Sequence, residues 1–520
     1  MTKYVTRNIL ALAISSLGLA SFAGEISKGY NTEIPHEIMT PDRVETRIGV
    51  MEFLDGRPTD ETIAAVYDNL DFLRGVEVFL NFIPAASIEG MRRGMLEMGQ
   101  DAPNKVLYFE KLMDSNPLFL TGNTDTVYAS VVFDMSETGP IVFDVPEGLG
   151  PSTVNDAFFR FVTDMGAPGP DKGKGGKYLI LPPDYEGDLS PPEGGMEASV
   201  DGVDYFVSRS PSYVNWFIAR GFLVDGKPDA ANKILEEGLR VYPLKDKESP
   251  PEMEFIAASE QAFNTIHANS YEFYEELDAV IQREPASNFS PEFLGMAAAI
   301  GLQKGSEFAP DERMEGILRD AIAVGNASAR AISFAPRMDG AFIYEDSAWQ
   351  AAFVGGDYKW LIDNGSGGRN LDARTLFFYL ATVNTPAMVV QKVGVGSQYA
   401  WAARDADGNY LDGAKTYKLN IPKDVPAKDF WSVVIYDPQT RSELQTGQPF
   451  PSKNSKRNEL IVNDDGSVDI YFGPSAPEGI EKNWIETVDG KGWFTILRLY
   501  GPLETYFDKS WRPGEIELID

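Results

Sequence analysis

Two blocks of short apolar strands constrain the fold of this chain most strongly. The apolar runs of the first block are residues 127–133, 140–145, 158–162 and 178–181, separated by connectors rich in glycine and proline. In the second block, which begins near residue 411, apolar and polar side chains alternate, as at Tyr417, Leu419 and Ile421. Short strands bounded by turn residues are typical of β-sandwiches and barrels. We therefore expect two β-rich domains.

Helical patterns fill the segments around these blocks. Apolar residues recur at helical spacing within residues 60–98, and Pro84 is expected to divide this stretch into two helices. Residues 212–333 are also expected to be mainly helical, with His267 on a helix. The predicted fold class is therefore α+β and β-dominated, with two β domains joined by a mainly helical segment.

The first 23 residues have the features of a secretory signal peptide. Lys3 and Arg7 precede an apolar stretch at 9–20, and small residues at Ser21 and Ala23 surround Phe22. A membrane span needs roughly 20 apolar residues, which this stretch does not reach. We expect cleavage after Ala23, a periplasmic or secreted mature protein, and no membrane span after cleavage.

Composition excludes several functions. The chain has 78 acidic and 46 basic residues and a net charge of −32, which argues against binding to nucleic acids or anionic membranes. It has no cysteine and only two histidines, His36 and His267, so thiol nucleophiles and His-rich or thiolate metal sites are not expected. We predict no bound cofactor or metal, although acidic loops leave calcium open.

Several motifs resemble those of two paired protein families. Residues 116–128 (NPLFLTGNTDTVY) and 169–179 (GPDKGKGGKYL) resemble the family known as domain of unknown function 1254. The C-terminal motifs resemble its companion, domain of unknown function 1214, at residues 430–433, 436–437, 471–474, 483–485 and 493–502. The resemblance implies two jelly-roll-like β-sandwich domains joined by helices and carries no settled activity.

Together, these observations predict five segments. They are a signal peptide at 1–23, an N-terminal helical segment at 24–105, a first β-sandwich domain at 106–211, a helical segment at 212–345 and a second β-sandwich domain at 346–520.

Polar residues on the predicted strands of the first β domain are the main candidates for chemistry. Asn123, Asp125 and Tyr128 lead into one strand. Asn155, Asp156, Arg160 and Asp164 form a second group, in which residues of equal parity share a face of a strand. Paired carboxylates can serve as general acid and base without histidine or cysteine. The alternative is a buried ion-pair network that only stabilises the domain.

Further candidates lie outside this group. Lys172 and Lys174, in a glycine-rich loop, could bind an anionic group, or the loop is simply an exposed hairpin. His267 is the best candidate for a general base, because histidine titrates near neutral pH. A lone histidine among aromatic residues is, however, usually structural. Trp431 and Arg498 could contact a ligand, or belong to the core of the second domain.

The sequence thus predicts two kinds of ligand site and leaves a third function open. Asp125, Asp156, Asp164 and His267 are candidate catalytic residues of a hydrolase or lyase. The other candidates would bind a small molecule or glycan without catalysis. The alternative is an oligomeric structural or surface-assembly protein, and in any case we expect a homo-oligomer.

Overall fold

A computed structural model describes residues 32–519. The predicted signal peptide lies outside the described residues. Two compact units meet between Asn69 and Leu70 and are described separately. The first unit contains an antiparallel sheet of three strands in the order β1 (Arg43–Thr46), β2 (Gly49–Leu54) and β3 (Arg57–Pro58), and the start of helix α1.

Helix α1 (Asp60–Glu97) is continuous, with Pro84 inside it. The expected division at Pro84 is therefore wrong. A proline inside a helix removes one backbone hydrogen bond, but here the flanking residues Ile83 and Ala85 are fully buried, and their packing holds the helix together. Farther along, a Cβ on Gly94 would lie 2.0 Å from the Asn264 carbonyl oxygen, so only glycine allows this close approach.

The first block consists of two open sheets. The six-stranded sheet has the order β14 (Glu254–Ala257), β4 (Lys105–Tyr108), β5 (Val127–Asp134), β12 (Val214–Gly221), β7 (Ser152–Asp156) and β8 (Phe161–Met165). The five-stranded sheet has the order β10 (Met196–Val200), β11 (Val203–Arg209), β9 (Gly176–Leu181), β6 (Ile141–Val145) and β13 (Arg240–Pro243). Side chains of both sheets, such as Val131, Phe143 and Phe217, share one hydrophobic cluster.

Strands β12, β13 and β14 lie within the segment that we expected to be mainly helical. Strand β12 carries buried side chains on both faces, so it lacks the alternation of polar and apolar residues that marks a strand with one exposed face. Short helices α2 (Met135–Thr138) and α3 (Asp229–Gly238) also belong to this part of the chain. The sheets of the first block therefore extend beyond residue 211, where the predicted domain ends.

The second block is a pair of sheets as well. One has the order β15 (Gln350–Ala351), β16 (Ser397–Ala402), β22 (Phe494–Pro502), β18 (Ala427–Tyr436) and β19 (Ser452–Asn454). The other has the order β21 (Trp484–Glu486), β20 (Val468–Gly473), β17 (Tyr417–Ile421) and β23 (Ile516–Leu518), and α9 (Glu504–Phe507) follows β22. The cluster between them includes Trp349, Leu419 and Trp493.

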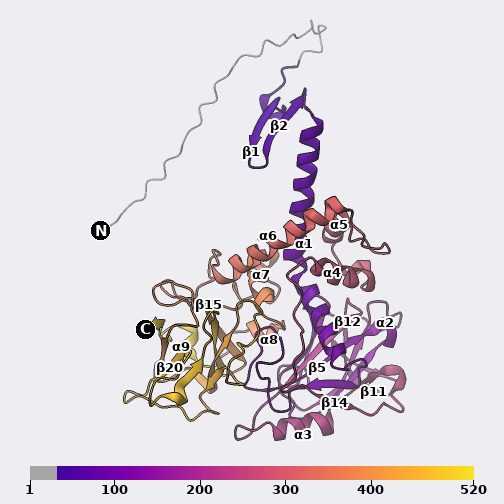
Figure 1. Cartoon of the computed structure of the whole chain (residues 1–520). Coiled ribbons are helices and arrows are strands. Elements are labelled where there is room, and N and C mark those ends of the chain that lie inside the picture. Colours follow the sequence, from indigo (N-terminus) through magenta and orange to yellow (C-terminus); the bar gives the residue numbers. More distant parts are fainter. Residues whose placement is uncertain (1–31, 520) are drawn as a thin grey trace. The chain divides into compact units, whose positions relative to one another are not determined.

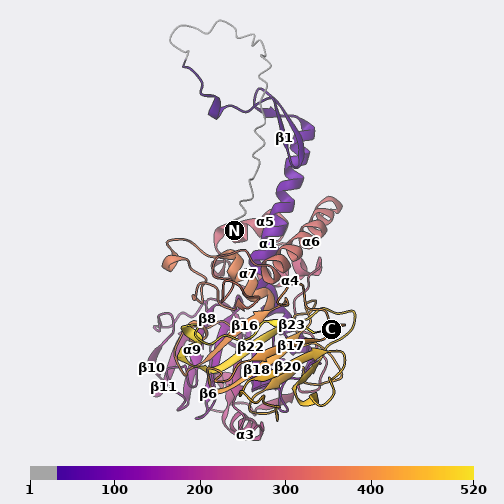
Figure 2. The ribbon, with the colours of Figure 1, turned by 90° about the vertical axis from the view of Figure 1, so that its left-hand side faces the viewer.

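Helices and a large hydrophobic cluster join the two blocks. The remaining helices are α4 (Glu272–Arg283), α5 (Pro291–Ala299), α6 (Glu312–Phe334), α7 (Leu371–Leu380) and α8 (Pro386–Val389). One cluster combines Phe79 of α1, Trp216 of the first block, Phe378 of α7 and Ile496 of the second block. The blocks lie side by side, with α4, α6 and α7 at one end and α3 at the other (Figures 1 and 2).

The second unit is thus β-rich, with helices and open sheets that are antiparallel or mixed, as expected in outline. None of the helices in residues 32–519 combines the length and the apolar composition that crossing a membrane requires.

Candidate functional site

A cavity of about 470 Å³ lies between the two blocks. The first block contributes side chains of β7, β8 and β12 and of Asp125 and Thr126 just before β5, and the second contributes side chains of β16, β18 and β22. The segment around α8 and the loop after β19 complete the wall. Its apolar lining includes Ile218, Phe222, Leu223, Val383, Met388 and Phe430.

Strand pairing explains why polar side chains of the first block reach the same cavity. Arg220 of β12 lies opposite Tyr128 of β5, and Ile218 lies opposite Thr153 of β7. Thr153 in turn lies opposite Asp164 of β8. Directly opposed residues share a face of the sheet, as do residues two apart on one strand. Arg220 and Asp164 are therefore presented on the same face, toward the second block.

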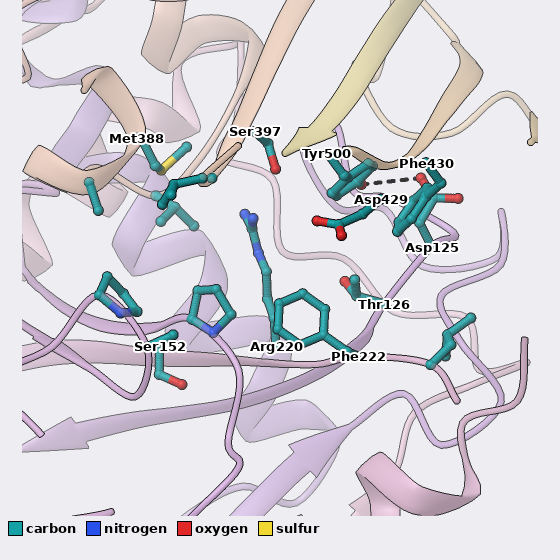
Figure 3. Close-up of a pocket in the computed structure, with 18 of the residues that line it drawn as sticks. Asp125, Thr126, Ser152, Arg220, Phe222, Met388, Ser397, Asp429, Phe430 and Tyr500 are labelled. Atoms are coloured by element: carbon teal, nitrogen blue, oxygen red, sulfur yellow. Dashed lines mark hydrogen bonds between the residues drawn. The ribbon is translucent and has the colours of Figure 1, made fainter. Parts of the chain in front are cut away.

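Arg220 is the most unusual side chain of the cavity. It is half-buried, and its side chain extends into the cavity with Asp125, Asp429 and Tyr500 on one side and Met388 on the other (Figure 3). Its guanidinium carbon lies 5.6 Å from the centre of the Tyr128 ring. Across residues 32–519, no carboxylate forms an ion pair with Arg220 and no backbone carbonyl accepts a hydrogen bond from it. The hydroxyl of Tyr399, another residue of the wall, accepts one hydrogen bond from Arg220, so most of the five guanidinium donors still face the cavity.

Asp125, in contrast to Arg220, has several hydrogen-bond partners. It is 1% exposed, and its carboxylate accepts hydrogen bonds from the Ser432 hydroxyl, from Asn454 Nδ2 at 2.8 Å and from the Tyr500 hydroxyl at 3.2 Å. Asn123 Oδ1 accepts from the backbone N–H of Asp125 at 2.8 Å, which fixes the turn before β5. Asp125 therefore links the two blocks across one wall of the cavity.

Asp164 is the second carboxylate of the cavity wall. It is 8% exposed, and its Oδ2 accepts a hydrogen bond from the Thr385 hydroxyl at 2.8 Å, whereas Oδ1 has no partner among the described residues. Burial raises the pKa of Asp164 to about 6, although the Thr385 hydrogen bond and the charge of Lys172 act in the opposite direction. Asp164 can therefore gain or lose a proton near neutral pH.

Other charged side chains lie toward the mouth of the cavity. Asp429 and Lys456 are exposed. Arg457 is half-buried, and its guanidinium donates to the hydroxyl oxygens of Thr124 at 3.1 Å and Ser452 at 3.2 Å. A smaller cavity of about 50 Å³ shares Arg220 with the large one and is lined by the predicted ligand residues Asn123, Tyr128 and Arg498.

Asn155, Asp156 and Arg160, which were predicted in one group with Asp164, do not line either cavity. Asp156 is fully buried and accepts from the backbone N–H groups of Phe158 and Arg160 and from Arg160 Nε at 2.6 Å. Asn155 exchanges two hydrogen bonds, of 2.7 and 2.8 Å, with the backbone of Asn384. These contacts are those of the structural alternative, a buried network that orders the turn between β7 and β8.

His267 is also away from both cavities. It lies in the irregular segment between β14 and α4, not on a helix as expected. Burial lowers the pKa of His267 to about 3, and the positive charge of Arg441 acts in the same direction. The ring is therefore neutral at physiological pH, and its Nδ1 is 2.9 Å from the Ala268 carbonyl oxygen.

The remaining candidates are distributed over three places. Lys172 and Lys174 are exposed in a loop that Asp171 closes by accepting from the Gly175 backbone N–H at 3.1 Å. Trp431 packs in the core of the second block. Arg498 is buried and donates to the Thr121 carbonyl oxygen at 2.8 Å, which joins the second block to the first.

Sequence reasoning missed Arg220, Tyr399 and Thr385. Arg220 had one recognisable signal, a single arginine at the end of the apolar run 214–219. Tyr399 and Thr385 reach the cavity only through the folding of the second block, and nothing in their local sequence marks them. In residues 32–519, no group of three or more His, Asp or Glu side chains is arranged to hold a metal ion.

Comparisons with known proteins support the two-block organisation. The family model described as "Protein of unknown function (DUF1254)" matches residues 103–243, and the one described as "Protein of unknown function (DUF1214)" matches residues 396–504. The chain thus contains one region similar to each family, called here its DUF1254 and DUF1214 domains. Their order agrees with the resemblance seen in the sequence, and the DUF1254 match includes β12 and β13. The cavity thus lies between the DUF1254 and DUF1214 domains.

One solved structure shares the fold, and a second matches more weakly. The VPA0106 protein from Vibrio parahaemolyticus matches with a TM-score of 0.52 and 16% identity, over 87% of this chain and 100% of that chain. An uncharacterized protein from Burkholderia cenocepacia matches with a TM-score of 0.37 and 11% identity, over 88% of this chain and 97% of that chain. Comparison with curated proteins finds no match.

Proposed function

We propose that this protein binds a small molecule in the cavity between its DUF1254 and DUF1214 domains. The observation that carries the proposal is the cavity itself, whose volume of about 470 Å³ is in the range of known small-molecule sites. Its wall combines apolar side chains with a few polar ones, which is the usual composition of such sites. A ligand there would contact both domains, so binding would also stabilise their junction.

A catalytic step is not part of this proposal. Asp125 and Asp164 both line the cavity, but three donors already occupy the Asp125 oxygens. Asp164 remains the better candidate for proton transfer, because it has a free oxygen and a pKa raised by burial to about 6. We therefore propose ligand binding alone and no reaction.

The wider setting is proposed from the sequence. The N-terminal pattern around Ser21–Ala23 supports export to the periplasm or the medium. Jelly-roll-like topology of the two blocks, homo-oligomer formation and calcium binding stay predictions. Light scattering of residues 24–520 tests the oligomer, and titration with calcium tests the metal.

A thermal-shift screen tests the proposed function. The screen covers sugars, organic acids, alcohols, phosphate esters and divalent metals, because a ligand of the folded state raises the melting temperature by mass action. Ala387 lines the cavity on α8, so Ala387→Trp would fill part of the space. The matched control is Ala299→Trp, at an exposed helical alanine of α5.

We expect at least one compound to raise the melting temperature of the wild type and of Ala299→Trp, and to lose most of that effect in Ala387→Trp. A screen without hits contradicts the proposal. So does a hit that stabilises Ala387→Trp as much as the wild type, since that ligand would bind elsewhere.

A further inference from the structure

We infer that the ligand of this cavity is an apolar organic molecule with a single carboxylate, and that Arg220 binds the carboxylate. The inference rests on the proposed function, since it names the class of ligand for the same cavity. Three features of the cavity support the inference: the hydrogen bonds of Arg220, the contacts of the aspartates and the apolar lining.

Arg220 hydrogen-bonds the Tyr399 hydroxyl but no carboxylate or backbone carbonyl in the described residues. Other arginines that are at least half-buried donate to the protein: Arg441 to the Tyr379 carbonyl at 3.1 Å, Arg498 to the Thr121 carbonyl at 2.8 Å and Arg209 to the Tyr185 carbonyl at 2.9 Å. Arg220 has no such acceptor in the described residues, in a chain with a net charge of −32 that offers many carboxylates. A guanidinium kept away from all of them is available to an anion from outside.

The aspartates of the same cavity do not pair with Arg220. Asp125 is held by Ser432, Asn454 and Tyr500, and Asp429 is exposed at the mouth. Asp164 accepts a hydrogen bond from the Thr385 hydroxyl at 2.8 Å. None of the three forms an ion pair with Arg220, so its charge is left for a ligand to neutralise.

The geometry and the single charge of Arg220 favour a carboxylate over a phosphate. The guanidinium group binds a carboxylate through two parallel hydrogen bonds, so one arginine matches one carboxylate. A phosphate monoester carries about two charges and would need a second cation beside Arg220. Arg457 donates through Nη2 to the Thr124 and Ser452 hydroxyl oxygens, its Nε is buried without a partner in the described residues, and Lys456 is exposed at the mouth. The apolar side chains Ile218, Leu223 and Met388 would contact the rest of the molecule.

Calorimetry with pairs of charged and neutral probes tests this inference. The probes are octanoate against octanol and benzoate against benzyl alcohol, with octyl phosphate as the competing anion. The proteins are the wild type, Arg220→Gln and the matched control Arg209→Gln. Arg209 is also half-buried, lacks an ion pair among the described residues and lies 5.7 Å from a tyrosine ring, that of Tyr185, away from the cavity.

We expect the wild type to bind at least one carboxylate about 10- to 100-fold more tightly than its alcohol, as for a hydrogen bond to a charged group. Arg220→Gln should remove this preference, and Arg209→Gln should keep it. If Arg220→Gln does not fold, the comparison of carboxylate and alcohol on the wild type decides alone.

Four results would overturn the inference. Equal binding of carboxylate and alcohol, or an unchanged preference in Arg220→Gln, would leave small-molecule binding intact but remove the role of Arg220. Tighter binding of octyl phosphate would indicate a phosphate site. If no carboxylate binds, the inference fails, and the broader thermal-shift screen shows separately whether the proposed function fails with it.

Discussion

Glu89 and Arg220 are charged side chains inside the same compact unit, but their surroundings differ. Glu89 is 1% exposed and accepts hydrogen bonds from Arg92 at 2.7 and 2.8 Å, Arg93 at 2.8 Å and Arg283 at 3.1 Å, which join α1 to α4. Burial raises the pKa of Glu89, yet these arginines outweigh burial and hold it near 2. Arg220 has no such partner in the described residues.

The difference separates a structural use of charge from a functional one. A buried charge surrounded by opposite charges stabilises the fold, because removing it leaves its partners uncompensated. A charge such as Arg220, which hydrogen-bonds a neutral hydroxyl but has no opposite charge beside it, contributes less to folding and can bind a ligand. Substitutions at the two places should therefore affect different measurements, and the following predictions start with the largest expected effect.

Removing Glu89 should have the largest effect on stability. Glu89→Ala should lower the free energy of unfolding by about 3 kcal/mol, because it leaves three arginines without their common partner. Urea unfolding followed by circular dichroism measures the change. The control is Glu315→Ala, which breaks an exposed pair with Arg319 and should change stability by about 0.5 kcal/mol or less. Equal effects of the two substitutions would contradict a structural role for the cluster.

Replacing Asp164 should make stability less dependent on pH. Its pKa is about 6 when folded against an ordinary value of 3.8, so the folded state holds the proton more tightly and loses stability as pH rises from about 4 to above 6. Asp164→Asn removes this penalty and keeps an acceptor for Thr385. The variant should gain about 2 kcal/mol more over the wild type at pH 8 than at pH 4.5, since each pKa unit corresponds to about 1.4 kcal/mol.

Unfolding at the two pH values checks this prediction, with Asp429→Asn at the exposed mouth as the control. An Asp164→Asn variant that is less stable than the wild type at pH 8 would show that the carboxylate is needed in its charged form.

Asp156 tests the same distinction between structural and functional charges. The sequence predicted a catalytic residue, whereas its contacts resemble those of a structural residue. Asp156→Ala should lower the free energy of unfolding by about 2 kcal/mol, since the N–H groups of Phe158 and Arg160 lose their acceptor. Calorimetry should give an unchanged affinity for any ligand of the cavity. A large loss of affinity in a folded Asp156→Ala variant would show that Asp156 contributes to ligand binding after all.

Arg220 should have the smallest effect on stability. Arg220→Gln should change the free energy of unfolding by about 0.5 kcal/mol or less, because no carboxylate or carbonyl in the described residues loses a partner. Urea unfolding without ligand checks this, with Arg498→Gln for contrast. Arg498 donates to the Thr121 carbonyl and its loss should be clearly destabilising. A destabilisation by Arg220→Gln as large as that of Arg498→Gln would assign Arg220 to the fold.

The fold was predictable where the local pattern is simple. Strands such as β17 and β20 alternate apolar and polar residues and lie where the sequence predicted them. Strand β12 was missed because both of its faces are buried, and the division of α1 was predicted because Pro84 was judged without the packing around it.

The candidate site was predictable only in part, for a related reason. Asp125 and Asp164 line the cavity, but the sequence does not show that donors from the second block surround Asp125, as Ser432 and Asn454 do. For Arg220, the sequence would have to show that no carboxylate or backbone carbonyl of the fold accepts its hydrogen bonds. Both are properties of side chains brought together over more than 200 residues of sequence, which local patterns do not contain.

The central claim is that Arg220 offers its charge to a ligand in the cavity between the DUF1254 and DUF1214 domains. The most direct test is a crystal structure of residues 24–520 with octanoate or benzoate, at a concentration that calorimetry shows to saturate the protein. The account predicts the carboxylate within hydrogen-bonding distance of the Arg220 guanidinium and the apolar part against Ile218 and Met388. An empty cavity at saturation, or a carboxylate bound away from Arg220, would contradict it.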